Sequence, residues 1–160
     1  IISGKTTAES PYGVENIKVD SAIEMKEKIE SCIENYDCLI MAAAVSDFKV
    51  KNRKELKIKK QDGIDSLELE ENPDILKSLI KKENQIFIGF AAETNNLLEN
   101  ARKKLDKKNL DYIVLNDVSK KDIGFNSEYN KVSVISKDNI LDIERDTKLN
   151  IADRILDLIK

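Results

Sequence analysis

The chain has 160 residues, with 27 basic and 30 acidic side chains, a net charge of −3 and no histidine. This length predicts a single domain over residues 1–160 with a sizeable core. The missing histidine excludes Ser-His-Asp and Cys-His catalysis and histidine zinc sites. Any chemistry therefore uses Lys, Asp, Glu, Asn, backbone groups or a metal carried by the substrate. The charge balance argues against a general nucleic-acid binder, and no apolar run is long enough for a transmembrane helix.

The start of the chain and its two cysteines bear on its origin. Cys32 and Cys38 lie in helical or apolar contexts, and free thiols in a cytoplasmic protein explain them better than a disulfide. No signal-peptide pattern is present at the start. Ile1-Ile2-Ser3-Gly4 is typical of the end of a buried strand. We therefore expect a piece of a longer chain, N-terminally truncated so that the first strand and helix of the fold are missing.

A short strand and a helix are the first complete elements. Glu15–Val19 is the expected strand. Ser21–Tyr36 has the periodicity of an amphipathic helix, and Ser21 with Glu24 forms a capping box at its start. The helix residues predicted to face the core are Ala22, Met25, Ile29, Ile33 and Tyr36.

Continuous apolar runs alternate with helices along the rest of the chain. The three runs are typical of parallel strands buried on both faces: Cys38–Val45, Gln85–Ala91 and Tyr112–Leu115. Asn72 is the expected N-cap of one helix and Pro73 its first residue. Further helices are predicted over residues 95–108 and 149–159. Residues 57–60 and 66–70 alternate around Gly63 as one hairpin, and 131–136 and 140–144 form another.

This order of elements predicts an α/β fold. We expect a Rossmann-like, mainly parallel sheet flanked by helices, with an antiparallel hairpin extension. Right-handed crossovers then place ligand sites at the carboxyl ends of the parallel strands.

Residues after the first buried run are candidates for a ligand site. Ala42, Ala43 and Ala44 are small enough for a ligand to approach the backbone, although they could equally pack under a helix. Asp47 could bind a cation carried by phosphates or cap a turn. Phe90, in the second run, could stack on a base or belong to the core.

Basic residues supply candidate phosphate contacts. The segment from Lys49 to Lys60 contains seven of them and could be a phosphate clamp or a solvated face. Lys104 and Lys108 are four residues apart, hence on one helix face, where they could hold a triphosphate or be solvated. The helix start at Asn72-Pro73-Asp74-Ile75 offers backbone N–H groups to an acceptor. No Walker A pattern and no G-x-G-x-x-G pattern is present.

Taken in order, these segments resemble the bacterial phosphopantothenoylcysteine synthetase (phosphopantothenate–cysteine ligase) family, the second half of the bifunctional coenzyme A biosynthesis protein. The resemblance covers essentially the whole chain. The matching motifs include Ala42-Ala43-Ala44-Val45-Ser46-Asp47-Phe48, Lys57-Ile58-Lys59-Lys60, Asn72-Pro73-Asp74-Ile75-Leu76, Gly89-Phe90-Ala91-Ala92-Glu93-Thr94, Ala101–Leu105 with Lys108, and Asn116-Asp117. The second, third and fourth of these, in this order, are the most specific.

The resemblance implies a CTP- and Mg²⁺-dependent ligase that joins 4′-phosphopantothenate to L-cysteine. The carboxylate attacks the α-phosphate of CTP, and the cysteine amine then displaces CMP from the acyl-cytidylate. It also implies a homodimer, with the hairpin near Lys57 crossing the interface, and fusion to a flavin-dependent decarboxylase domain upstream. Membrane and nucleic-acid partners are not expected.

Site roles follow from the same resemblance. Lys57 would be the catalytic residue and stabilise charge at the reacting phosphate, and Asp47 would bind the phosphates through the cation. The residues expected to bind CTP are Met41, Ala42, Ala43, Ala44, Asp47, Lys57, Pro73, Asp74, Ile75, Leu76, Phe90, Lys104 and Lys108.

One departure and three alternatives remain. The family's opening strand, its S-S-G-K-M-G segment and the catalytic Asn before that segment have no counterpart here. The alternatives are a non-catalytic nucleotide-binding module of the same fold, a dinucleotide oxidoreductase and an RNA-binding basic hairpin. The missing glycine fingerprint disfavours the second, and the net charge disfavours the third.

Overall fold

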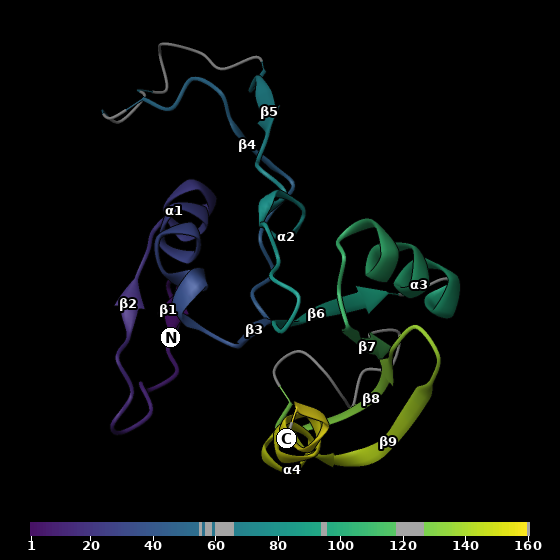
Figure 1. Ribbon diagram of the computed structural model, residues 1–160. Helices are drawn as coiled ribbons and strands as arrows, with labels where there is room; N and C mark the ends of the chain where they lie inside the picture. The colour runs from purple at the N-terminus through teal and green to yellow at the C-terminus, as the bar shows by residue number, and fades with distance from the viewer. Residues whose placement is uncertain (55, 57–58, 60–65, 94–95, 118–126, 160) are drawn as a thin grey trace.

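The main sheet has five strands. The structure is a computed structural model that describes residues 1–54, 56, 59, 66–93, 96–117 and 127–159. The sheet order is β3-β6-β7-β8-β9 (Figure 1). These strands are β3 (Cys38–Met41), β6 (Ile86–Glu93), β7 (Tyr112–Asp117), β8 (Tyr129–Ile135) and β9 (Ile140–Thr147). β3, β6 and β7 run parallel, and β8 and β9 extend the sheet antiparallel. The predicted α/β fold with its antiparallel extension is confirmed.

Helices cover both faces of this sheet. They are α1 (Ala22–Cys32), α2 (Ile75–Ser78), α3 (Leu97–Lys107) and α4 (Lys148–Leu156), with short 3₁₀ turns η1 (Ile33–Asn35) and η3 (Asp157–Ile159). One core joins α1, α2 and α3 to the face that carries Phe87 and Ala91. A second core joins α4 to the opposite face, through Ile88 and Val114. Successive strand residues point to opposite faces, so β6 supplies both cores.

The first two strands form a small sheet of their own beside α1. β1 (Ile2–Ser3) pairs in parallel with β2 (Ile17–Lys18). The predicted N-cap is present, since Ser21 Oγ accepts from Glu24 N–H, but the Glu24 carboxylate accepts from Asp20 N–H rather than from Ser21 N–H, so the capping box is formed only in part. Met25, Ile29 and Ile33 are buried as predicted, but Tyr36 is 54% exposed. The prediction for Tyr36 is wrong because the α-helix gives way to the 3₁₀ turn η1 at Ile33. Tyr36 ends that turn with an extended backbone and therefore no longer continues the helical spacing of Met25, Ile29 and Ile33.

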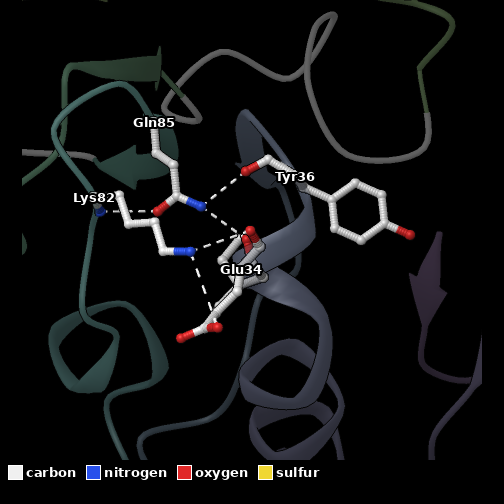
Figure 2. Close-up of polar contacts among 5 residues, drawn as sticks. Glu34, Tyr36, Lys82 and Gln85 are labelled. Carbon is white, nitrogen blue, oxygen red and sulfur yellow. Dashed lines mark hydrogen bonds and ion pairs between the residues drawn. The ribbon is translucent and has the colours of Figure 1, made fainter.

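A buried glutamine joins α1 to the sheet (Figure 2). The Gln85 amide donates to the backbone carbonyls of Ile33 (2.7 Å) and Tyr36 (2.8 Å), and its Oε1 accepts from Lys82 N–H (2.9 Å). Gln85 is 5% exposed. Its side chain therefore bonds carbonyls at the end of the helix, where Ile33 O also accepts from Tyr36 N–H, and it fixes η1 against the start of β6.

A two-stranded arm projects from the body of the molecule (Figure 1). β4 (Phe48–Val50) pairs antiparallel with β5 (Leu69–Glu71). This ribbon is not the predicted hairpin of residues 57–60 and 66–70 around Gly63: β5 overlaps the predicted second strand, but its partner is Phe48–Val50. Most of the predicted first strand and the turn at Gly63 lie outside the described residues, so that hairpin stays a prediction. Residues 57, 58 and 60, including Lys57, lie outside the described residues.

Two further predictions need correction. β3 ends at Met41 rather than Val45 and is an edge strand of the main sheet, so it is only half-buried, and Ile40 is 41% exposed. α2 is capped by Asp74 rather than Asn72, and it begins at Ile75. Asn72 instead bonds a neighbouring segment, as described below, which leaves the capping role to Asp74.

Candidate functional site

The segment that follows β3 exposes its backbone. Met41 is half-buried, whereas Ala42, Ala43 and Ala44 are exposed and carry only methyl groups. Small side chains at a strand end allow a ligand to reach backbone groups. The exposure of Ala42–Ala44 excludes the alternative that they pack under a helix in this chain.

Asn72 connects this segment to α2. Its backbone N–H donates to the Asp47 carbonyl (2.8 Å), and its side-chain amide donates to the Ser46 carbonyl (2.9 Å). These two bonds hold Asp47 beside Pro73, although the residues are 26 positions apart. The Asp47 side chain is exposed, so its carboxylate is available to a ligand.

Asp74 brings a third segment into the cluster. Its carboxylate accepts from Lys77 N–H (3.4 Å) as the N-cap of α2, and it lies 3.1 Å from Lys108 Nζ. Ile75 and Leu76, the next two residues, are buried in the core. Their side chains are therefore committed to packing, and only their backbone groups can meet a ligand.

The end of α3 fixes the backbone of Lys108. Leu110 N–H donates to Leu105 O and Asn109 N–H to Asp106 O, with Asn109 at φ 50°. This is a Schellman motif with asparagine in the left-handed position. Lys108 N–H donates to the carbonyl of Lys104, one turn earlier, and both lysines are half-buried whereas Lys103 and Lys107 are exposed.

Gly89 lies where α2 and the end of α3 meet β6. A Cβ at Gly89 would lie 2.6 Å from Leu110 Cδ1 and 3.6 Å from Leu76 Cδ1. The close approach of these side chains places the start of α2 and the end of α3 over the same strand, below the Asp74–Lys108 pair.

Phe90 is not part of this cluster. Its side chain is 40% exposed, and strand alternation puts it on the face that carries Ile88, opposite Phe87 and the α3 lysines. Asn116 lies on the same face as Phe90, and its buried Oδ1 has no hydrogen-bond partner among the residues that the structure describes. In this chain, therefore, the structure does not bring Phe90 together with Lys104 and Lys108.

The cation prediction concerns Asp47. The described part of the chain contains no group of three or more Cys, Asp or Glu side chains that could hold a metal ion. One exposed carboxylate fits a cation that a triphosphate brings with it, because Mg²⁺ is commonly held by one or two carboxylates plus phosphate oxygens. The catalytic prediction, Lys57, lies outside the described residues.

A cavity separates the β1–β2 unit from the main sheet. Its volume is about 690 Å³, and its walls come from β1, α1, β3 and the segment after β3. β1 pairs only with β2, and β3 only with β6, among the strands that the structure describes. Cys32 and Cys38 line the cavity. Burial raises the pKa of the Cys38 thiol, and the charge of Asp111 adds to the rise.

Sequence reasoning missed three features of the site. The Asn72 bonds, the Asp74–Lys108 pair and the cavity all join segments far apart in the chain. Only Asn72 and Asp74 had a local signal, since both are good N-cap residues, and that signal did not reveal their partners.

Among the helices that the structure describes, none has the length and the apolar composition that a membrane span needs.

The chain is similar to proteins of coenzyme A biosynthesis. It is 46% identical over 140 residues to the coenzyme A biosynthesis bifunctional protein CoaBC of Bacillus subtilis, which covers 86% of this chain and 34% of that protein. It therefore spans about a third of this relative. A crystal structure of the C-terminal domain of a CoaBC protein matches with a TM-score of 0.80 and 36% identity, over 99% of this chain and 70% of that one.

A more distant solved structure shares the fold. It is a Cab2 mutant in complex with phosphopantothenate-cysteine, with a TM-score of 0.61 and 20% identity, over 88% of this chain and 51% of that one. The family described as the DNA/pantothenate metabolism flavoprotein C-terminal domain matches residues 1–160. The chain belongs to this family, and its resemblance to the synthetase part of the bifunctional protein is confirmed.

Proposed function

We propose that the chain is the nucleotide-binding part of a CTP-dependent phosphopantothenate–cysteine ligase. One observation carries the proposal: Asp47, the segment Pro73–Leu76 and Lys108 come from three separate motifs and meet in one cluster. The coenzyme A biosynthesis relatives support the pathway, and the phosphopantothenate-cysteine complex of the distant neighbour supports the ligase class.

The proposed chemistry has two steps. A carboxylate oxygen of 4′-phosphopantothenate attacks the α-phosphorus of CTP, forming an acyl-cytidylate and releasing pyrophosphate. The amine of L-cysteine then attacks the acyl carbon, loses a proton, and expels CMP. Both steps build negative charge on phosphate oxygens, which fixed ammonium groups stabilise. The reaction therefore needs no imidazole.

Residue roles follow the cluster. Lys104 and Lys108 hold the triphosphate, Asp47 faces it, and Lys57 acts as the catalytic residue at the reacting phosphate. Backbone groups of Met41–Ala44 and Pro73–Leu76 contact the nucleotide. Mg²⁺, arriving with CTP beside Asp47, would neutralise phosphate charge. Phe90 contacts the nucleotide only if CTP reaches past the edge of the sheet or meets a second copy of the chain.

We also propose a homodimer built on the arm. Phe48, Val50 and Leu69 share one face of the β4–β5 ribbon and are 40–56% exposed, with Glu71 opposite Phe48 at one end of this face. The other face carries the Lys49–Glu70 and Lys51–Glu68 ion pairs. Because an isolated two-stranded ribbon is only marginally stable, an apolar face of this kind favours a partner, and a second copy offers the same face.

The cavity supports one further part of the proposal, namely that a strand from outside these 160 residues lies between β1 and β3. Within the described ranges, β1 pairs only with β2 and β3 only with β6, so each has a free edge, and most of the cavity lining is apolar. An inserted strand would slow alkylation of Cys32 and Cys38 relative to the 160-residue chain. Equal alkylation rates of the two cysteines in the longer protein and in the 160-residue chain would contradict the inserted strand.

Fusion to a flavin-dependent decarboxylase domain belongs to the same proposal, because the matched region makes up only 34% of the bifunctional relative.

Pyrophosphate release tests the proposed function. The full-length protein is incubated with 4′-phosphopantothenate, Mg²⁺ and each nucleoside triphosphate in turn, before L-cysteine is added. We expect release with CTP, followed by CMP and phosphopantothenoylcysteine once cysteine is present. Tight CTP binding without pyrophosphate release would instead favour a non-catalytic nucleotide-binding module, the alternative function.

A further inference from the structure

The Asp74–Lys108 ion pair is more sheltered than the Lys103–Glu99 ion pair of α3. Lys108 and Asp74 are 27% and 35% exposed, with 3.1 Å between Nζ and Oδ1. Lys103 and Glu99 of α3 are 70% and 64% exposed. Partial shielding from water strengthens the attraction between opposite charges. Asp74 therefore attracts the Lys108 ammonium group more strongly than Glu99 attracts that of Lys103.

Both partners of this pair are held by their backbones. Lys108 is the last residue before the Schellman turn at Asn109, whose bonds fix the end of α3. Asp74 caps α2 and lies two residues after Asn72, which is bonded to the segment at Ser46 and Asp47. The carboxylate and the ammonium group thus meet because two fixed helix ends bring them together.

This contact sets up a competition at Lys108. An ammonium group that already contacts a carboxylate has to share or exchange that contact when a phosphate arrives, and the carboxylate repels the phosphate. We propose that Asp74 acts through Lys108 as a competing counter-ion, which weakens the hold on the phosphates and speeds the release of pyrophosphate. This inference rests on the proposed phosphate role of Lys108.

The substitution Asp74→Asn separates the charge from the cap. Asparagine caps helices about as well as aspartate, so α2 keeps its start while the carboxylate charge is removed. We expect pyrophosphate to bind about two- to fivefold more tightly, the range that a partly exposed ion pair implies. Glu99→Gln, which removes the exposed pair on the same helix, is the matched control and should leave pyrophosphate affinity unchanged.

Calorimetric titration of the full-length protein with pyrophosphate tests the inference, using the wild type, Asp74→Asn, Lys108→Met and the double variant. We expect Lys108→Met to weaken binding, and Asp74→Asn to give no gain in the Lys108→Met background, because the competition acts through that ammonium. Unchanged or weaker binding by Asp74→Asn, or an equal gain in the double variant, would overturn the inference alone. Unchanged binding by Lys108→Met would overturn the proposed phosphate role and the inference with it.

Discussion

The middle of the main sheet and the β4–β5 arm stabilise themselves in different ways. In β6 and β7, Ile88, Ile113 and Val114 are at most 1% exposed, and each strand has a partner on both sides. In the arm, Phe48 and Leu69 are more than half exposed, and ion pairs line the opposite face. The middle of the sheet is paired and covered within one chain, whereas the described residues leave Phe48, Val50 and Leu69 of the arm exposed.

The largest expected effect is in the middle of the main sheet. Ile88→Ala removes a side chain that is fully buried against α4, and it should lower the free energy of unfolding by about 2–5 kcal/mol because a cavity is left behind. Urea denaturation measures the change. Ile80→Ala, at a side chain that is 89% exposed, is the control and should change stability by less than about 0.5 kcal/mol.

The buried glutamine gives the next effect. Gln85→Leu leaves the carbonyls of Ile33 and Tyr36 and the N–H of Lys82 without this partner, so stability should fall by roughly 1–3 kcal/mol. Glu34→Gln, which removes only the exposed 3.9 Å contact with Lys82, should cost less than about 1 kcal/mol. Similar losses from both variants would mean that Gln85 does not anchor α1.

Substitutions in the arm should change dimerisation rather than the stability of the monomer. Phe48→Ser with Leu69→Ser should weaken dimerisation about tenfold or more while changing the free energy of unfolding of the monomer little, because both side chains are exposed in one chain. Sedimentation velocity over a concentration series measures this. Dimerisation that is unchanged would remove the arm from the interface, and a large loss of monomer stability would show that the arm packs on its own body.

The smallest effect concerns pH at the start of α4. Hydrogen bonds from the Asn150 side chain and from Thr147 N–H lower the pKa of the Asp146 carboxyl. The stability it contributes is present above the pKa of the unfolded carboxyl and is lost as pH falls through the lower folded value. Asp146→Asn should remove this part of the acid dependence, and Asp138→Asn, in an exposed turn, should not. Stability curves measured from neutral to acidic pH compare the two.

Local signals in the sequence predicted most of the body but little of how its parts meet. The apolar runs of β6 and β7 and the N-cap at Ser21 were confirmed, because each depends on neighbouring residues. The burial of β3 was overestimated, since a strand at a sheet edge and a central strand can have the same composition. The Asp74–Lys108 contact joins residues 34 positions apart, and no spacing rule predicts such a pair.

Binding of CTP to two lysine variants of α3 tests the central claim most directly. Lys108 is half-buried beside Asp74, whereas Lys103, on another face of the same helix, is exposed and pairs with Glu99. If the cluster of Asp47, Pro73–Leu76 and Lys108 holds the phosphates, Lys108→Met should weaken Mg²⁺–CTP binding about tenfold or more in calorimetry, the scale of a charge-assisted contact, and Lys103→Met should leave it unchanged. Equal affinities for the two variants would contradict the claim.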